Sequence, residues 1–332
     1  MNGSRPYDPS VYAGVRAVVL GAGGFIGRWV ARAVARTGAE TSLVVRDADR
    51  ARPVFDAMGI GGRLVEADLG EPGRAASVLE EIRPAITFNL AGYGVDPAED
   101  APEVAERVNA DLARSVAQAC AAIADRRWPG QHLVHTGSAL EYGTAAGDLS
   151  EDTVCKPTTV YGRTKLAGTQ AVADMSAGGD LCAITARLFT VYGPGEHHGR
   201  LLPSLLGTAD TGRPLDLTDG SQRRDFTFVE DVAEGLLRLG AAEAQPGTVV
   251  NLATGQLETV RAFVETAGRV LSIPLELLRF GARAGRPAEM EHDDVSVERL
   301  QQLTGWLPST AIGDGIAATA VYEGAMGRWP SG

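Results

Sequence analysis

The stretch VRAVVLGAGGFIG, residues 15–27, decides the fold of this 332-residue chain. Val15 to Leu20 is an apolar run rich in β-branched residues, which predicts a buried parallel strand. Glycines follow at 21, 23, 24 and 27, and Phe25 to Arg36 carries apolar residues at helical spacing. A glycine-rich turn between strand and helix lets the backbone approach a pyrophosphate at the helix N-terminus. The stretch therefore predicts a dinucleotide-binding unit, a tight structural turn being the alternative.

Strand-like and helix-like segments alternate through the first half of the chain. Gly38 signals the end of the first helix. Further strands are expected at 42–45, 63–67, 86–90, 133–136 and 182–189, and helices at 102–124 and 159–175. This alternation predicts an α/β fold with a Rossmann-type, doubly wound parallel sheet and right-handed crossovers.

The pattern changes after about residue 192, where prolines and glycines separate shorter elements. We expect a loose N-terminal tail at 1–14, an NAD(P)-binding domain at 15–192 and a mainly substrate-binding lobe at 193–330. A further strand near 248–251 is expected to join the main sheet.

Composition excludes several classes of protein. The formal net charge is −11, with 44% hydrophobic and 22% charged residues, as in a globular protein that buries a sizeable core. The acidic balance argues against nucleic acid as a partner. No run approaches the ~18 apolar residues of a membrane span, so no membrane partner is expected. Cys120, Cys155 and Cys182 lack metal-ligand spacing, so we expect no metal and three reduced, buried thiols of a cytoplasmic protein.

The end of the second expected strand selects between NAD and NADP. An acidic side chain there binds the ribose 2′-hydroxyl, whereas an arginine accommodates the 2′-phosphate of NADP. The sequence reads Val45-Arg46-Asp47, and the guanidinium fork matches a phosphate. We therefore expect NADP with Arg46 as a ligand. Asp47 keeps NAD open as the alternative, with Arg46 then a solvated strand end.

Tyr161 and Lys165 lie one helical turn apart and so share a helix face. The chain has only two lysines and seven tyrosines, so chance rarely gives this spacing, although an exposed i,i+4 pair is the alternative. An ammonium group beside a phenol stabilises the phenolate, which lets Tyr161 exchange a proton with a carbinol or carbonyl. Ser138, just past the expected strand 133–136, can bind the same oxygen.

Further motifs follow in a fixed order from Val15 onward. They are Gly21 to Gly27, Asn89 to Gly92, Ser138 with Tyr142-Gly143, Tyr161 to Lys165, Arg187 to Gly195, Arg200 to Pro203, Arg224 to Asp231, Arg286-Pro287 and Gly305 to Pro308. In order and spacing they resemble the extended short-chain dehydrogenase/reductase family, and within it the nucleotide-sugar epimerase, dehydratase and ketoreductase branch.

This resemblance implies a role for each matching residue. The implied catalytic residues are Ser138, Tyr161, Lys165 and Asn109, the last supporting a proton relay to Lys165. The implied cofactor contacts are Gly21, Gly24, Phe25, Ile26, Gly27, Arg46, Asp68, Leu69, Leu90, Ala91, Tyr161 and Lys165. The implied substrate contacts are Ser138, Thr190, Arg200, Arg224 and Arg286. Arg224 and Arg286 would clamp a diphosphate, with surface ion pairing as the alternative.

Departures from the family pattern narrow the chemistry. The dehydratases carry an acidic pair where this chain has Ala139 and Leu140, and Glu141 comes one place too late. This argues against a 4,6-dehydratase. Thr190 stands where the family usually has Asn, and Gly92-Tyr93-Gly94 is an unusual continuation that we expect to shape the sugar pocket.

The function that this resemblance implies is an NADP(H)-dependent oxidoreductase acting on a nucleotide-diphosphate sugar. A 4-ketoreductase of a nucleotide-4-keto-6-deoxysugar ranks first, closely followed by a nucleotide-sugar 4-epimerase with tightly bound NAD. A catalytically silent cofactor sensor and a reductase of aromatic or CoA-type carbonyls are further alternatives. The sequence does not determine the nucleotide, the sugar, the stereochemistry or the pathway.

The helices expected at 102–124 and 159–175 carry apolar faces beyond what one sheet needs. In the family such helices pair into a four-helix interface. We therefore expect a homodimer.

Overall fold

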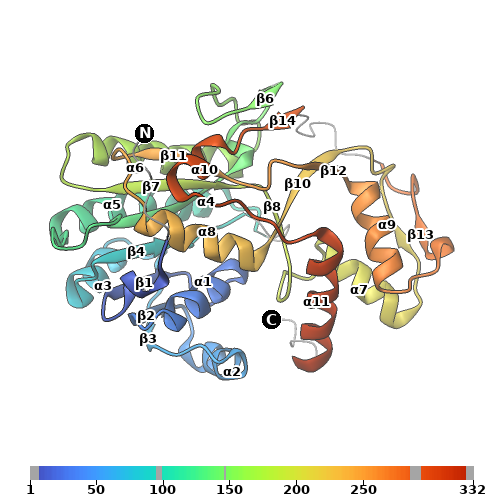
Figure 1. Cartoon of the computed structure of the whole chain (residues 1–332), viewed down its shortest axis with the longest axis horizontal. Coiled ribbons are helices and arrows are strands. Elements are labelled where there is room, and N and C mark those ends of the chain that lie inside the picture. The colour runs from blue at the N-terminus through green and yellow to red at the C-terminus, as the bar shows by residue number, and fades with distance from the viewer. Residues whose placement is uncertain (1–6, 95–98, 146, 285–292, 327–332) are drawn as a thin grey trace.

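A seven-stranded sheet forms the centre of the protein (Figure 1). The computed structural model describes residues 7–94, 99–145, 147–284 and 293–326. The sheet order is β11-β7-β5-β4-β1-β2-β3, and every neighbouring pair is parallel. Its strands are β1 Arg16–Leu20, β2 Glu40–Val45, β3 Arg63–Glu66, β4 Ile86–Asn89, β5 Leu133–Ser138, β7 Ala183–Leu188 and β11 Thr248–Leu252. The predicted doubly wound fold is confirmed, and the winding reverses between β1 and β4.

Helices cover both faces of this sheet. One face carries α1 (Phe25–Arg36), α2 (Ala48–Met58) and α8 (Val229–Ala241), and the other carries α3 (Arg74–Ile82), α5 (Leu112–Ile123) and α6 (Val160–Ala177). Side chains alternate accordingly along β1, where Ala17 and Val19 join the first apolar cluster and Val18 and Leu20 the second. All four are fully buried, which explains the unbroken apolar run in the sequence.

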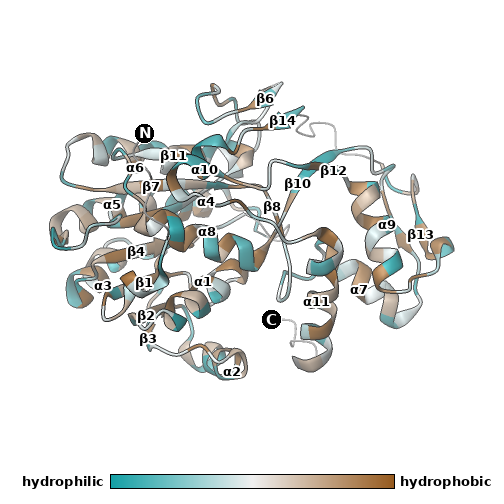
Figure 2. Ribbon diagram, in the orientation of Figure 1, coloured by the Kyte–Doolittle hydropathy of each residue, from teal (hydrophilic) through white to brown (hydrophobic). Residues whose placement is uncertain are grey.

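Smaller sheets and helices form the remaining part of the molecule. Of these, α7, α9 and β13 lie at the right of Figure 1, whereas β6 and β14 lie at its top and α10 lies near β11. Three sheets lie outside the central one: β12-β10-β8, β13-β9 and β14-β6. Their strands are β6 Asp148–Leu149, β8 Thr190–Tyr192, β9 Leu215–Asp216, β10 Arg223–Phe228, β12 Leu257–Thr259, β13 Leu278–Arg279 and β14 Asp294–Val295. The helices are α7 Leu201–Thr211, α9 Val260–Val270, α10 Glu298–Thr304 and α11 Ile312–Met326. Figure 2 shows hydrophilic residues on the outer elements, β10 and β12 among them, and brown, apolar residues along the strands of the main sheet.

The helix expected at 102–124 is continuous but not uniform. It begins as α4 (Pro102–Ala105), widens into a π-helical segment, η2 (Glu106–Asp111), and continues as α5. A π segment inside an α-helix is rare and often marks a functional site. Here it contains Asn109, which is 1% exposed.

Two boundaries differ from the sequence-based expectation. Strand β5 runs two residues further than predicted, so Ser138 is its last residue rather than a loop residue. The N-terminal tail is not loose up to residue 14, because Pro9–Tyr12 forms a 3₁₀ turn, η1. The Tyr12 ring packs in the core beside Trp128, and its hydroxyl donates a 2.5 Å hydrogen bond to the Leu237 carbonyl. The division at residue 192 stays a prediction.

The three cysteines are free thiols, but only one of them is fully buried. Cys120 is buried beside Thr87, and burial raises the pKa of its thiol to about 12. Cys155 and Cys182 are half-buried, so the prediction of three buried thiols was wrong for these two. Within the described part of the chain, no helix is long and apolar enough to cross a membrane.

The tight β1–α1 turn gives a test of folding. A side chain at Gly27 would run into the Gly21 carbonyl oxygen, whereas one at Gly23 would only touch the Val45 side chain at an ordinary 3.6 Å. We expect Gly27→Ala to lower the free energy of unfolding by about 1–3 kcal/mol through overpacking. Gly23→Ala should leave it unchanged or raise it by up to about 1 kcal/mol. Chemical denaturation measures both, and equal stability of the two variants would contradict this account.

Candidate active site

The glycine-rich turn lies directly against the end of β4. Gly21 has φ +75°, and a Cβ atom there would come within 2.8 Å of the Ala91 backbone nitrogen. Helix α1 starts at Gly24 with no side chain capping its first amides. Those amides and the positive end of the helix dipole are the groups that hold a pyrophosphate. The cradle therefore fits a dinucleotide.

The other residues expected to contact the cofactor follow the same edge of the sheet. Leu90 and Ala91 come directly after β4, where Leu90 donates a backbone hydrogen bond to Leu20. Asp68 and Leu69 follow β3, with Asp68 exposed and Leu69 buried. Parallel strands end on one side of a sheet, so these residues lie along the same edge as the crevice between β1 and β4, with Asp68 and Leu69 two strands away at β3. Phe25 and Ile26 open α1 beside them.

Arg46 follows β2 and is exposed to solvent. The two nearby carboxylates are occupied by helix α2: Asp47 accepts from the Arg50 amide at 2.9 Å, and Glu66 accepts from the Ala48 amide at 2.9 Å. No hydrogen bond or ion pair holds the Arg46 side chain within the described segments. The guanidinium is therefore available to a ligand, while Asp47 already serves as a helix cap.

Ser138 and Tyr161 meet at the end of β5. Tyr161 is the second residue of α6, whose cap residue Thr159 accepts a hydrogen bond from the Gly162 amide. Burial raises the pKa of Tyr161 to about 12, and a hydrogen bond with Ser138 acts in the opposite direction. The neutral phenol is thus the resting form, ready to donate a proton to a developing oxyanion.

Lys165 lies one turn along α6 and is 3% exposed. Its Nζ donates a 2.5 Å hydrogen bond to the Thr136 carbonyl oxygen. Burial lowers the pKa of Lys165 to about 8, while the negative charge of Glu141 partly restores it. Lys165 is therefore buried and Tyr161 partly buried, so the alternative of an exposed helix pair does not fit.

Asn109 organises the backbone beside Tyr161. Its Nδ2 donates to the Tyr93 carbonyl at 2.8 Å and to the Thr164 hydroxyl at 3.0 Å, and its Oδ1 accepts from the Tyr93 amide. Gly94 follows, close enough that a Cβ there would lie 3.1 Å from the Tyr161 ring. No direct bond from the Asn109 side chain to Lys165 appears among the described residues, so its part in a proton relay stays a prediction.

Glu141, to which the sequence analysis gave no role in the site, links three elements of the site. Glu141 is fully buried, and its Oε1 accepts from the Ser138 amide at 2.8 Å and from the Thr169 hydroxyl at 3.0 Å. Its Oε2 accepts from Arg187 Nε at 2.9 Å. The carboxylate thus joins β5, α6 and β7. It cannot serve as a dehydratase acid, because its oxygens hold the chain itself. In the sequence, the only indication of this role is that a glutamate stands between Ser138 and the pair Tyr142-Gly143.

The expected substrate contacts are only partly brought together. Arg200 is the cap residue of α7, and its charge favours the ionised form of Tyr161, so it lies near the catalytic hydroxyl. Thr190 opens β8 and pairs in register with Phe226 of β10. Arg224, in β10, donates to the Arg223 carbonyl at 2.7 Å. Arg286 lies outside the described residues.

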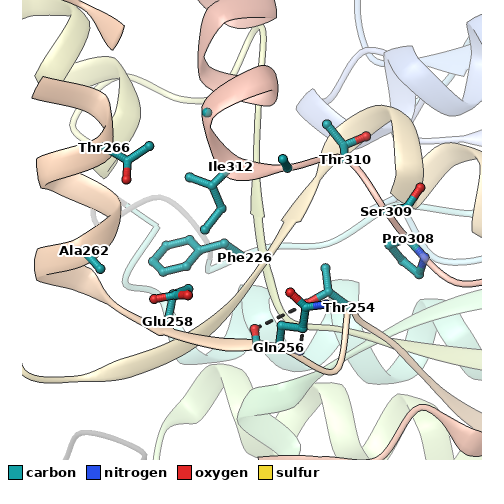
Figure 3. Close-up of a pocket in the computed structure, with 12 residues that line it drawn as sticks. Phe226, Thr254, Gln256, Glu258, Ala262, Thr266, Pro308, Ser309, Thr310 and Ile312 are labelled. Atoms are coloured by element: carbon teal, nitrogen blue, oxygen red, sulfur yellow. Dashed lines mark hydrogen bonds between the residues drawn. The ribbon is translucent and has the colours of Figure 1, made fainter. Parts of the chain in front are cut away.

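A separate cavity of about 400 Å³ lies between β10, β12, α9 and the start of α11 (Figure 3). Phe226 forms its floor, stacked on Phe263 with ring centroids 4.3 Å apart. Asp231 holds one wall by accepting from the Ser309 and Thr310 amides. The cavity contains none of the expected catalytic, cofactor or substrate residues.

Comparison with known proteins agrees with this geometry. The NAD-dependent epimerase/dehydratase family matches residues 17–253. The chain belongs to this family. A dTDP-6-deoxy-L-talose 4-dehydrogenase (NAD(P)(+)) from Kitasatospora kifunensis is 31% identical over 314 residues, covering 92% of this chain and 94% of that protein. A UDP-glucose 4-epimerase from Mycolicibacterium smegmatis is 28% identical, covering 93% and 98%.

Solved structures extend the likeness. MoeE5 in complex with UDP-glucuronic acid and NAD is 25% identical, with a TM-score of 0.78 over 94% of this chain and 99% of that one. The protein is therefore an NAD(P)-dependent enzyme with the extended short-chain dehydrogenase/reductase fold. This excludes the silent cofactor sensor.

The arrangement is chemically suited to proton transfer at a carbon–oxygen bond. When bound, the dinucleotide supplies or accepts the hydride. In such a reaction Ser138 would donate a hydrogen bond to the reacting oxygen, and Tyr161 would pass a proton to or from the same atom. The positive charge of Arg200 favours the phenolate of Tyr161, and the ammonium of Lys165, one helical turn away, would act in the same direction.

The buried pair of Glu141 and Arg187 gives a test of the site's support. Glu141→Gln removes the charge that compensates Arg187, whose side chain is 5% exposed. We expect unfolding to require about 3–5 kcal/mol less, because a buried charge is left unpaired. We also expect kcat to fall, since Lys165 loses the negative charge that favours its ammonium form and the acceptor for the Ser138 amide becomes weaker.

The matched control is the exposed pair Arg63–Glu81, whose side chains are 63% and 64% exposed. Glu81→Gln should cost less than about 1 kcal/mol and leave kcat unchanged. Denaturation and steady-state kinetics measure both variants. An equal loss of stability in the two would refute the role of Glu141.

Proposed function

We propose that the protein is an NADP(H)-dependent 4-ketoreductase of a nucleotide-linked 4-keto-6-deoxysugar. The triad of Ser138, Tyr161 and Lys165 supports carbonyl reduction. The relative that supports the substrate class is the dTDP-6-deoxy-L-talose 4-dehydrogenase, which matches over nearly the whole length of both chains. A dTDP-4-dehydrorhamnose reductase from Streptomyces griseus, 30% identical over 70% of this chain, supports the same class.

The choice of NADP rests on how the side chains after β2 are engaged. Asp47 and Glu66 cap helix α2, and Arg46 remains exposed. A guanidinium in this place favours the 2′-phosphate of NADP, which in reductases serves as the reductant. Ala139 and Leu140 in place of an acidic pair further support a reaction without loss of water.

The competing proposal is a nucleotide-sugar 4-epimerase with tightly bound NAD. It is favoured by the UDP-glucose 4-epimerase among the relatives and by the NAD that MoeE5 binds. The two activities use the same proton transfer at Tyr161 and differ in whether the hydride stays on the product. A reductase of aromatic or CoA-type carbonyls would not need an arginine near Tyr161, so the position of Arg200 argues against that alternative.

We also propose that the protein is a homodimer, as the sequence analysis predicts. The exposed positions of α5 include Arg114 and Gln118, and those of α6 include Arg163 and Gln170. Most apolar residues of α5 pack within the chain, whereas α6 leaves Val160 exposed and Leu166 and Ala167 only partly covered, so α6 offers the more apolar surface to a second copy.

The proposed activity is tested with nucleotide-linked 4-keto-6-deoxysugars and ordinary nucleotide hexoses. Absorbance at 340 nm follows NADPH or NADH, and the sugars are separated afterwards. Stoichiometric loss of NADPH with a keto sugar is the expected result, and Tyr161→Phe should lower kcat at least about 100-fold. A new epimer without net cofactor change would replace the ketoreductase by the epimerase.

Cofactor selectivity gives a second test. Arg46→Ala should raise the Kd of NADP⁺ about 10- to 100-fold, because charge-assisted hydrogen bonds contribute ~1.5–3 kcal/mol, and should leave the Kd of NAD⁺ nearly unchanged. Arg36→Ala, an exposed arginine at the far end of α1, is the control. Fluorescence titration measures both dinucleotides. Equal weakening of NAD⁺ and NADP⁺ would rule out recognition of the 2′-phosphate by Arg46.

A further inference from the structure

The segment of residues 193–200 connects β8 to α7 and links the two halves of the active site. At one end it is tied to α1: Arg28 donates to the Gly195 carbonyl at 2.9 Å, and Trp29 Nε1 donates to the Pro194 carbonyl at 2.9 Å. At the other end Arg200 lies close enough to Tyr161 for its charge to lower the pKa of the phenol. The segment therefore runs from the dinucleotide cradle to the point of proton transfer.

Glu196, within this segment, has an incomplete set of hydrogen bonds. Its side chain is 6% exposed, and Oε1 accepts from Arg200 Nε at 3.3 Å. Its other oxygen, Oε2, is buried and has no hydrogen-bond partner among the residues that the structure describes. Burial raises the pKa of Glu196 to about 7, against the opposing charge of Arg200. A buried carboxylate oxygen without a donor is costly, so the position is adapted to a donor from outside the chain.

In the described part of the chain, no other buried carboxylate has a buried oxygen that lacks a hydrogen-bond partner. Glu141 uses both oxygens on donors of its own chain. Glu151, whose side chain is 3% exposed, accepts from the Asn251 amide at 2.9 Å and lies 4.0 Å from Arg299. Neither leaves a buried oxygen without a hydrogen-bond partner. A purely structural role would be expected to satisfy Glu196 in the same way.

The chemistry of the missing donor follows from the charges around it. Arg200 already balances the negative charge of Glu196, so a cation is not required. Hydroxyl groups are the neutral donors that a sugar substrate brings to the neighbourhood of Tyr161. We propose that Glu196 is a specificity residue of the sugar site, with Oε2 accepting a hydrogen bond from a ring hydroxyl while Arg200 fixes Oε1. This inference rests on the proposed nucleotide-sugar function.

The test pairs a protein variant with a substrate variant. The kcat/KM of wild type and Glu196→Ala is measured for a nucleotide-linked 4-keto-6-deoxysugar with hydroxyls at C2 and C3, and for its 2-deoxy and 3-deoxy analogues. We expect Glu196→Ala to lower kcat/KM for the parent sugar about 10- to 100-fold. For one of the two deoxy analogues, kcat/KM should already be low with wild type. Glu196→Ala should lower that value little further, because the deoxy change and the substitution remove the same hydrogen bond.

Two further variants separate recognition from folding. Glu196→Gln keeps the shape and a carbonyl acceptor, so its loss should be smaller than that of Glu196→Ala. Glu151→Gln is the control for removing a buried carboxylate, and it should lower kcat/KM for the parent and both analogues by one common factor. Thermal unfolding is recorded for all variants, and the Kd of NADP⁺ should be unchanged by either substitution at Glu196.

The outcomes are distinct. If Glu196→Ala slows parent and analogues alike, or weakens NADP⁺ instead, the hydroxyl assignment is overturned while the proposed ketoreductase stands. If wild type neither binds nor reduces any sugar of the panel, the proposed function fails and the inference fails with it. Loss of activity confined to a hydroxyl-bearing sugar supports both.

Discussion

The active site depends on one approach of backbone to backbone. Gly21 lies against Ala91, and Gly27 lies against the carbonyl of Gly21, at distances that leave no room for a Cβ atom. This contact sets the start of α1 over the crevice between β1 and β4. The uncapped amides of α1 and the ends of β2, β3 and β4 then converge on one ligand. With a larger residue at either glycine, the turn could not close against β4.

Buried charge is the second constraint, and the chain compensates most of it internally. Lys165 and Arg187 are both nearly inaccessible, and the carboxylate of Glu141 interacts with each of them. An isolated charge at such depth would be neutralised or would destabilise the fold. The same carboxylate also fixes the end of β5, so the position of Ser138 and the charge of Lys165 have a common support.

The sequence was sufficient for the sheet, the glycine cradle and the Tyr161–Lys165 pair because each has a local signature. Residues whose role depends on distant partners were less accessible. The role of Glu141 depends on its contacts with Thr169 and Arg187, which are distant in sequence. The role of Glu196 depends on its burial, which no nearby residue indicates. Tyr12 seemed part of a tail, since nothing near it in sequence indicates Leu237 or Trp128 as neighbours. The end of β5 was missed because Gly137 and Ser138 have low strand propensity, which pairing with β7 overrides.

The π-helical turn at Glu106–Asp111 has a consequence for how the protein can evolve. Such a turn holds one residue more than an α-helical turn, and each residue of a helix corresponds to a rotation of about 100°. Deleting that residue would regularise the helix but would turn the buried face of α5 away from β4, or else turn Asn109 away from Tyr93 and Thr164. Substitutions can change the chemistry of this helix one side chain at a time. The number of residues in the helix up to Asn109 must stay constant. Only with the π-helical turn can Asn109 reach Tyr93 and Thr164 while the buried face of α5 still packs on the sheet.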